Sequence, residues 1–540
     1  MTSVLKDPDG VIVVMCKGAD SVLFPLLKNP DDPEVKALID QTNVYLDEYA
    51  KTGLRTLLIV ERRISQEEYS EWSIKYKEAS ESLQNRDAKL EECAADLEKG
   101  FELVGSTAIE DKLQEGVPET IDHIKAAGIK LWVLTGDKIE TAINIGYSCR
   151  LLDDSINQFI IDASKSLEVY KQLCIAENKQ NLYMGQRQMA LIVGGDSLLK
   201  IFQNDKLRER FVKLVEMAVV VLACRVSPKQ KAEIVQMARR EHPTATTLAI
   251  GDGANDVNMI TAAHVGVGIS GLEGQQAKRA SDYAISKFCY LQPLLFYHGR
   301  EAYRRNALLC LYMFYKNILY VIPQYWYGFV SAFSGQTLYE SWLYQGYNIV
   351  FTAFPIMWFA IFDEEFTKQQ FVRDPYLYWI GVSDACYTYG KLWRIVLQAI
   401  FNALLIDLLV FFSLNGARLV DSEGENGTFW ESATLVYAIV VIVANIYILQ
   451  KTNTHTIWSS LLIFLSIGAF FFMFWFENLF FYFYDVYTIF PELMSNMKTY
   501  LVIMIACWSC MAQDMAKSLY KKWQEDKRRA KLGSIIDQRA

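Results

Sequence analysis

The sequence lacks three features that would each have pointed to a different class of protein. Positive charge is not in excess: 62 acidic residues outnumber 54 lysine and arginine residues, the formal net charge is -8, and no nucleic-acid partner is expected. The 29 glycines and 12 prolines follow no repeat, and 52% of the residues are hydrophobic, which excludes a collagen-like or disordered chain. The opening MTSVLKDPDG lacks the apolar core of a signal peptide, so we expect the first membrane span to follow a cytosolic domain.

Long apolar runs are absent before residue 300 and frequent after it. A chain of 540 residues allows about three or four domains. The later apolar stretches are each long enough to cross a hydrocarbon core of roughly 30 Å with about 20 helical residues. We therefore expect a soluble half followed by an all-α membrane half of six transmembrane helices. The predicted spans are 307–331, 341–362, 393–414, 430–450, 456–476 and 499–517.

Lysine and arginine are concentrated on one side of these predicted spans. If residues 1–300 are cytosolic, the loops on that side and the tail 519–540 are basic, whereas the opposite side offers mainly Arg418 and Lys498. This distribution obeys the positive-inside rule and predicts a multi-pass protein of the plasma membrane or an endomembrane. The basic loop residues are Lys368, Arg373, Lys391, Arg394 and Lys451.

No cysteine falls in a predicted outer loop, where a disulfide would form. All 10 cysteines lie in cytosolic segments or spans, so we expect reduced thiols. Cys507 and Cys510 form a CxxC pattern inside an apolar helix without a second ligand pair, which favours packing over zinc binding. Asn426 opens a glycosylation acceptor pattern on the expected outer side.

The second part of the soluble half alternates between strands and helices. Helical stretches such as Pro118–Ala127 and Lys229–Arg239 separate short apolar runs. This alternation predicts a doubly wound parallel sheet, with a ligand site beyond the carboxyl ends of its strands. The predicted strands are Lys130–Leu134, Leu191–Val193, Ala218–Leu222, Thr246–Ile250 and Val265–Ile269.

Two of these strands end in polar turns that should face the same crevice. The turn after the fourth strand holds Asp252 and Asp256, four residues apart and separated by a flexible glycine, a set that suits Mg²⁺. Asn255 is placed to bind a phosphate. The alternative is an ordinary Asp/Gly turn without an ion.

The turn after the first strand and a later helix start add two further candidates. The hydroxyl of Thr135 and the adjacent backbone amides can hold a phosphoryl oxygen where a helix begins, although Thr135 alone also suits an N-cap. Lys231, near the start of another helix, can neutralise charge on a transferring phosphoryl group, although most such lysines are simply solvated.

Together these turns resemble the phosphotransferase site of the haloacid dehalogenase-like fold. Long runs of sequence are similar to the phosphorylation domain of P-type ATPases. The segments LTGDKIETAINI and GISGLEGQQAKRASDYAI resemble the type IV branch, the phospholipid-transporting ATPases or flippases. The matching runs are DKLQEGVPETIDHIKAAGIKLWVLTGDKIETAINIG, CRVSPKQKAEIV and GDGANDVNMITAAHVGVGISGLEGQQAKRASDYAI.

The resemblance implies a role for each polar residue of the two turns. Asp252 and Asp256 would serve the Mg²⁺ site, and Lys231, Asn255 and Thr135 would act on the phosphate as the catalytic set. The nucleotide would lie beside these residues and beside Gly136, Asp137 and Arg225.

The first hundred residues fit the same family. Cys16-Lys17-Gly18-Ala19-Asp20 and Gly53-Leu54-Arg55-Thr56-Leu57 are similar to its nucleotide-binding domain, where Lys17 and Arg55 would face ATP; either residue alone is otherwise a surface cation. We expect Gln66–Lys99 to be solvent-facing helix. The implied domains are part of a nucleotide-binding domain at 1–100, a phosphorylation domain at 101–298, the membrane domain at 299–518 and the tail at 519–540.

The chain also departs from the family pattern. No DKTG sequence, which carries the phosphorylated aspartate of the family, occurs in it. The four earlier spans and the actuator domain are missing as well. We therefore expect the C-terminal half of a pump, which would not complete an ATPase cycle alone.

The membrane half carries little negative charge. Ion pumps of this superfamily hold cations with carboxylates in the spans, yet the first two predicted spans contain no aspartate or glutamate. Lys316 lies eleven residues past Arg305, roughly 16 Å into the bilayer, where a cation costs about 2.5–3.5 kcal/mol. Asp407, in the third span, is expected to make an interhelical hydrogen bond.

The Phe314-Tyr315-Lys316-Asn317 sequence resembles flippases, and this resemblance implies a lipid headgroup path lined by Lys316, Asn317 and Asn348. The alternative is that Lys316 bonds only to backbone carbonyls that Pro323 exposes. The expected function is ATP-driven phospholipid movement toward the cytosolic leaflet, with a small glycosylated accessory subunit. Two alternatives are a non-catalytic membrane fragment or regulatory half, and an ion-transporting P-type ATPase.

Overall fold

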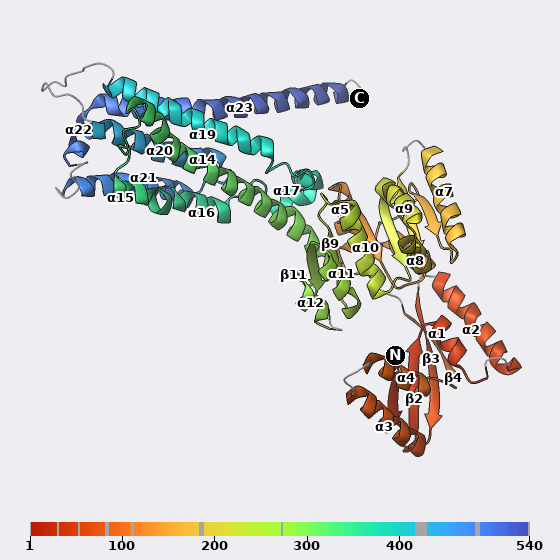
Figure 1. The fold of residues 1–540 in the computed structure, drawn as a ribbon. Helices are drawn as coiled ribbons and strands as arrows, with labels where there is room; N and C mark the ends of the chain where they lie inside the picture. The colour runs from red at the N-terminus through yellow and green to blue at the C-terminus, as the bar shows by residue number, and fades with distance from the viewer. Residues whose placement is uncertain are drawn as a thin grey trace. The chain divides into compact units, whose positions relative to one another are not determined.

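The computed structural model describes residues 2–29, 32–51, 54–81, 86–109, 113–182, 188–271, 274–415, 429–480 and 487–537. The chain divides into two compact units, Met1–Gln292 and Pro293–Ala540 (Figure 1). The first unit mixes strands and helices, and the second is helical.

An antiparallel sheet of order β1-β2-β3-β4 begins the first unit. Its apolar side buries Val14, Leu58 and Val60, which pack with Phe101 and the adjoining helices. The helix predicted over Gln66–Lys99 is two helices, and it is not wholly solvent-facing, because Trp72 Nε1 donates to the carbonyl oxygen of Cys93 at 2.9 Å. The elements are β1 (Thr2–Lys6), β2 (Ile12–Gly18), α1 (Asp20–Leu23), η1 (Phe24–Leu26), α2 (Pro33–Lys51), β3 (Arg55–Ile64), α3 (Gln66–Glu81), α4 (Arg86–Leu97) and β4 (Glu102–Ile109).

A parallel sheet of order β5-β8-β7-β6 follows. Successive side chains of a strand point to opposite faces, so Leu191 and Val193 of β7 join one core and Ala190 and Ile192 join another. The first core contains residues of α7 to α10, and the second contains residues of α5 and α6, so this sheet is doubly wound (Figure 1). Its strands are β5 (Leu131–Leu134), β6 (Asn157–Ile161), β7 (Met189–Gly194) and β8 (Ala218–Cys224).

The strands β9 (Leu248–Gly251), β10 (Val265–Ile269) and β11 (Tyr283–Ile285) form a separate parallel sheet of order β11-β10-β9. The prediction of one continuous sheet is therefore wrong for the described residues. Strands β5 and β9 each stand at the edge of their own sheet and share no hydrogen bonds. The helices of this region are α5 (Val117–Ala126), α6 (Ile139–Ser148), α7 (Ser166–Leu182), α8 (Gly195–Gln203), α9 (Asp205–Met217), α10 (Pro228–Glu241), η2 (Ala254–Asp256), α11 (Val257–Ala262), α12 (Gln276–Ala280), η3 (Phe288–Tyr290) and α13 (Leu291–Pro293).

The second unit is a bundle around α20, which is buried on all sides and contacts α14, α16, α19, α21, α22 and α23 (Figure 1). Its aliphatic and aromatic residues form one continuous core with those neighbours. The elements are η4 (Leu294–Gly299), α14 (Arg300–Val330), α15 (Ser341–Gly346), η5 (Tyr347–Phe351), α16 (Ala353–Phe362), α17 (Lys368–Arg373), η6 (Pro375–Tyr378), α18 (Trp379–Val382), α19 (Tyr389–Val410), η7 (Phe411–Asn415), α20 (Phe429–Lys451), α21 (Ile457–Asn478), α22 (Ile489–Ser495) and α23 (Met497–Asp537).

Among the described residues of this unit, five helical segments are long and apolar enough to cross a membrane. The first predicted span, 307–331, falls on α14 and its C-cap residue Ser331 and is not among them. Lys316, Asn317 and several tyrosines make this helix less apolar. The sequon at Asn426 and Arg418 lie outside the described residues. The five segments are Ser341–Phe362, Tyr389–Ser413, Phe429–Lys451, Ile457–Asn478 and Met497–Ala516.

Two expectations about polar side chains have opposite outcomes. All 10 cysteines are free thiols, as predicted. The hydrogen bond expected for Asp407 is absent: its side chain is buried in α19, and neither carboxylate oxygen has a hydrogen-bond partner within the described ranges.

Candidate functional site

The loop after β5 is fastened to the loop after β8 by backbone hydrogen bonds. Thr135 N donates to the carbonyl of Ala223 at 2.9 Å, and Val226 N donates to the carbonyl of Thr135 at 3.1 Å. Arg225 N also donates to the carbonyl of Asp137, at 3.0 Å. These bonds hold the start of α6 and the segment leading into α10 in one fixed arrangement.

Arg225 adopts a left-handed backbone conformation with φ 53°. Its carbonyl oxygen lies 2.2 Å from where a Cβ on Gly195 would stand, so only glycine fits at that position. Ser227 and Gln230 then form a capping box that begins α10. The tight turn therefore fixes where the first residues of α10 lie.

Thr135 makes a compact local hydrogen-bond pair with Asp137. The Thr135 hydroxyl donates to Asp137 Oδ2 at 2.8 Å and accepts from Asp137 N at 3.1 Å. Helix α6 begins just after this turn, and its N-cap residue Lys138 makes no side-chain cap. The first amides of α6 are therefore available to an anion, as helix N-termini favour.

Lys231 of α10 forms an ion pair with Asp256 at the end of η2. The Nζ–Oδ1 distance is 2.8 Å, and each side chain is only 12% exposed. A lysine in the first turn of a helix is opposed by the helix dipole, and the carboxylate of Asp256 compensates for it. The side chain of Asp256 lies against the end of β9. A Cβ added to Gly251 would stand 2.4 Å from the Cβ of Asp256.

In the second unit, Lys316 is buried on α14 and points at the break between α15 and α16. Its Nζ donates to Thr352 Oγ1 at 3.0 Å and lies 5.9–6.0 Å from the rings of Tyr312 and Tyr347. The Tyr347 hydroxyl in turn donates to the carbonyl of Lys316 at 2.9 Å. Within the described residues, the hydrogen-bond acceptor of this buried cation is thus a hydroxyl.

Comparison with known proteins assigns the chain to a family. A family model described as the phospholipid-translocating P-type ATPase C-terminal region matches residues 278–526. The phospholipid-transporting ATPase DRS2 of Saccharomyces cerevisiae is 40% identical over 447 residues, which cover 82% of this chain and 32% of that protein. The chain belongs to the type IV P-type ATPases.

Two further relatives match most of this chain and less than half of their own length. The phospholipid-transporting ATPase C887.12 of Schizosaccharomyces pombe is 41% identical over 449 residues, covering 82% of this chain and 35% of that protein. The probable phospholipid-transporting ATPase IM of Homo sapiens is 37% identical over 504 residues, covering 86% of this chain and 41% of that protein. The chain thus spans 32% to 41% of the length of these curated relatives.

The type IV ATPase resemblance implies Mg²⁺ at Asp252 and Asp256, and the residues fit a loosely held ion. Asp252 is exposed in the turn after β9, four residues before Asp256. In the part of the chain that the structure describes, no three histidine, cysteine or acidic side chains gather as a metal-binding set. Mg²⁺ is commonly held by one or two carboxylates, with waters and a substrate phosphate completing its shell. Asn255, in η2, is exposed beside them.

The candidate nucleotide residues lie at one end of the first sheet. Gly18 of β2 is opposite Leu58 of β3, so Lys17 and Arg55 stand near the same end of this strand pair. Lys17 is exposed, and the side chain of Arg55 lies outside the described atoms.

An ion pair that the sequence analysis missed joins the Cys16–Asp20 motif to the segment after the Thr135 turn. Lys138 Nζ lies 2.8 Å from Asp20 Oδ2, and the side chains are 31% and 23% exposed. Asp20 ends the Cys16–Asp20 motif, and Lys138 follows the turn at Thr135. Since 118 residues separate the pair in sequence, only the fold brings it together.

The three residues of the predicted headgroup path do not share one surface. Lys316 is buried, whereas Asn348 is exposed on the π-helical turn η5. The Asn317 side chain donates to the carbonyl of Met313 within its own helix, at 2.9 Å. Lys316 bonds Thr352 rather than backbone carbonyls near Pro323.

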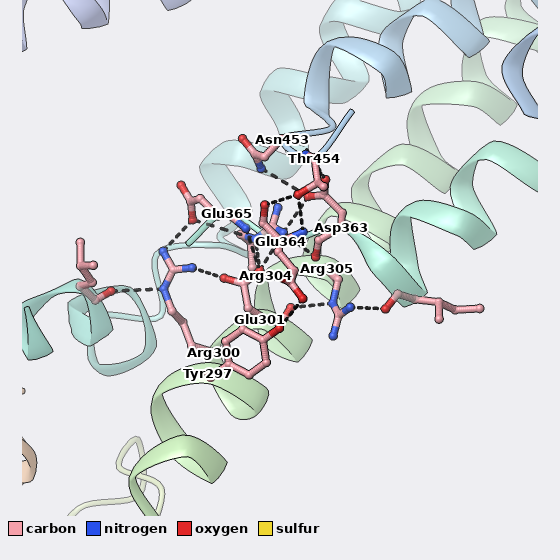
Figure 2. A network of polar contacts seen from close by, with 12 residues as sticks. Tyr297, Arg300, Glu301, Arg304, Arg305, Asp363, Glu364, Glu365, Asn453 and Thr454 are labelled. Carbon is pink, nitrogen blue, oxygen red and sulfur yellow. Dashed lines mark hydrogen bonds and ion pairs between the residues drawn. The ribbon is translucent and has the colours of Figure 1, made fainter. Parts of the chain in front are cut away.

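A second group that the sequence analysis missed follows α16. Asp363, Glu364 and Glu365, here called the acidic triplet, lie against η4, the start of α14 and the α20–α21 loop (Figure 2). A run of three acidic residues after an apolar helix is the signal that sequence reasoning had, but the arginine, tyrosine and loop partners of the triplet are between 59 and 91 positions away.

The thiol of Cys224, at the end of β8 beside the Thr135 turn, is expected to be unreactive. Burial, together with the nearby charge of Asp137, raises the pKa of the Cys224 thiol to about 12. Because the thiolate is the nucleophile, the folded protein should leave Cys224 unmodified by iodoacetamide at pH 8, while partly exposed Cys289 reacts. Mass spectrometry of native and unfolded protein measures this. Equal labelling of both thiols in the native protein would contradict the burial of Cys224.

Proposed function

We propose that this chain is the C-terminal part of an ATP-driven phospholipid translocase that moves lipid from the outer or lumenal leaflet to the cytosolic leaflet. The observation that carries the proposal is the buried lysine of α14, Lys316, whose ammonium donates to the hydroxyl of Thr352. A transporter of metal cations needs anionic oxygen ligands in its spans, whereas an anionic lipid headgroup needs a cation or a hydrogen-bond donor.

The soluble unit would supply the phosphotransfer chemistry. Lys231 would neutralise charge on the phosphoryl group, Thr135 and the first amides of α6 would bind its oxygens, and Asn255 would add a hydrogen bond. When bound, Mg²⁺ at Asp252 and Asp256 would supply charge to the phosphate oxygens. Lys17, Arg55, Gly136, Asp137 and Arg225 would lie around the ATP.

The missing nucleophile would enter on a further strand. Strands β5 and β9 are both edge strands of parallel sheets, and each ends in one of the two polar turns. A parallel strand inserted between them would complete a haloacid dehalogenase-like sheet. It would also bring the aspartate of a DKTG sequence between Thr135 and Asp252. In the described residues no strand of this chain occupies that position.

The membrane unit would move the lipid. We propose that α14 is a sixth span, since it is 31 residues long and packs against α16, α19 and α20 in the same bundle as the five apolar segments. Lys316 would contact the headgroup, with Asn317 and Asn348 nearer the lipid boundary. A small glycosylated subunit, implied by the family resemblance, would contact the outer loops.

The test uses a chimeric pump, in which the segment of the Saccharomyces cerevisiae relative that precedes the matched region is fused in front of this chain. Purified chimera is incubated with labelled ATP, Mg²⁺ and vesicles of defined phospholipids. We expect an acid-stable phosphoenzyme that one class of phospholipid discharges. The 540-residue chain alone should form none, because it has no DKTG sequence.

A second candidate function is a non-catalytic or regulatory membrane fragment, which the absence of DKTG favours. No phosphoenzyme in the chimera would support this alternative and reject the translocase. A phosphoenzyme that ignores every phospholipid but is discharged by a metal cation would instead identify an ion pump.

A further inference from the structure

The acidic triplet joins α16 to the segment that leads into α14 (Figure 2). Three of its partners are at positions 297, 300 and 304: Tyr297 lies in the π-helical η4, and Arg300 and Arg304 lie one turn apart on α14. Each acidic residue has a different nearest partner, and Arg304 Nε also lies 4.0 Å from Glu365 Oε2. The contacts are Tyr297 Oη to Glu364, Arg300 Nη2 to Glu365 Oε2 at 2.6 Å, and Arg304 Nη2 to Asp363 Oδ2 at 2.7 Å.

The Arg304–Asp363 pair is the buried centre of this network. The two side chains are 11% and 1% exposed, and Arg304 is also held by Glu301 at 2.8 Å. The other oxygen of Asp363 accepts the amides of Asn453 and Thr454 at 2.8 and 2.9 Å. One carboxylate thus connects α14, the end of α16 and the α20–α21 loop.

Helix α16 is attached to α14 at both of its ends. Thr352 is its N-cap and bonds Lys316, while Asp363 is its C-cap and bonds Arg304. Lys316 and Arg304 belong to the same unbroken helix, about 18 Å apart at 1.5 Å per residue. A helix of 10 residues held at both ends cannot slide or rotate unless one attachment opens.

We propose that the Arg304–Asp363 ion pair is a positioning element for the Lys316–Thr352 contact. It fixes the axial position of α16 so that the Thr352 hydroxyl stays within reach of the Lys316 ammonium. Neither Arg304 nor Asp363 touches the lipid. The inference rests on the proposed function only where it concerns lipid handling. The positioning of α16 is argued from the Arg304–Asp363 and Lys316–Thr352 contacts alone.

The alternative is that Asp363 serves only as a local cap for the α20–α21 loop. Asp363→Asn separates the two roles, because asparagine keeps an oxygen for the amides of Asn453 and Thr454 but loses the charge that holds Arg304. Arg304→Gln removes the same ion pair from the other side. Arg373→Gln, at an exposed arginine of α17, is the matched control.

The first experiment uses the 540-residue chain in lipid nanodiscs and needs no transport activity. Amide hydrogen exchange is followed in the peptide around η5 and Thr352. We expect Asp363→Asn and Arg304→Gln to raise exchange there about fivefold or more, the lower end of coupling between linked sites. The double variant should add nothing further. Unchanged exchange around η5 in both variants would overturn the proposal.

The second experiment measures lipid handling by the chimeric pump. We expect both variants to form phosphoenzyme as the parent does but to require about fivefold or more lipid for half-maximal stimulation. Raised exchange around η5 without any change in lipid requirement would reject the lipid part of the inference. If the parent chimera shows no lipid stimulation, the proposed function fails, while the exchange result still decides whether the ion pair positions α16.

Discussion

Asp256→Asn in the chimeric pump is expected to lower phosphoenzyme formation about a hundred- to thousandfold, the usual loss when a charged group is removed from a preorganised site. The substitution removes one of two carboxylates proposed to hold Mg²⁺. It also removes the carboxylate that pairs with Lys231, whose side chain is 12% exposed. The neutral amide can still accept a hydrogen bond, so the fold should persist.

Incorporation of labelled phosphate, titrated against Mg²⁺, measures this effect. Asp154→Asn is the matched control, because Asp154 is exposed in the turn before β6, at the amino ends of the strands. Lys231→Gln should cause a loss of similar size, and the double variant should lose less than the product of the two single losses. If Asp256→Asn kept phosphorylation within about threefold of the parent, well short of that expected loss, Asp256 would not belong to the site.

The sequence predicted the parallel strands well where they are apolar and buried. Strand β7 is buried along its whole length, and β10 has the predicted bounds Val265–Ile269. The short strands β6 and β11 were missed, because NQFII and YAI contain few residues and no clear alternation. A local pattern identifies a strand better than it identifies the neighbour to which the strand bonds.

The division into two sheets illustrates that limit. The runs that form β5 and β9 were predicted to share one sheet, and pattern alone could not show that they stand at separate edges. Pairing is a non-local property, fixed by which strands are available to bond. The polar turns were nevertheless found, because each follows its strand directly in the sequence.

Side-chain pairs between distant parts of the sequence were harder to predict than the motifs. Lys231 and Asp256 were both predicted in the site, yet their ion pair spans 25 residues and appears only in the folded chain. The Lys138–Asp20 pair and the acidic triplet were missed for the same reason. Asp407 was predicted to bond another helix, but neither of its carboxylate oxygens has a hydrogen-bond partner within the described residues.

Lys316→Met in the chimeric pump is expected to lower lipid stimulation of ATP hydrolysis strongly while the protein stays folded. A buried cation in a span costs about 2.5–3.5 kcal/mol, so an apolar side chain of similar length should leave the melting temperature equal or higher. The substitution leaves no hydroxyl unpaired, because Thr352 Oγ1 still donates to the carbonyl of Tyr347 at 2.6 Å. Loss of function without loss of stability separates a binding role from a structural one.

ATP hydrolysis is measured with and without phospholipid vesicles, together with the melting temperature. We expect lipid stimulation to fall about tenfold or more, since a charge-assisted contact contributes roughly 1.5–3 kcal/mol. Lys498→Met, at an exposed lysine before α23 enters the bundle, is the control and should keep stimulation. Thr352→Val should keep part of it, because Lys316 retains its charge beside Tyr312 and Tyr347. If Lys316→Met instead lowered the melting temperature and kept lipid stimulation, the lysine would be a packing residue, and the headgroup would be recognised elsewhere in the bundle.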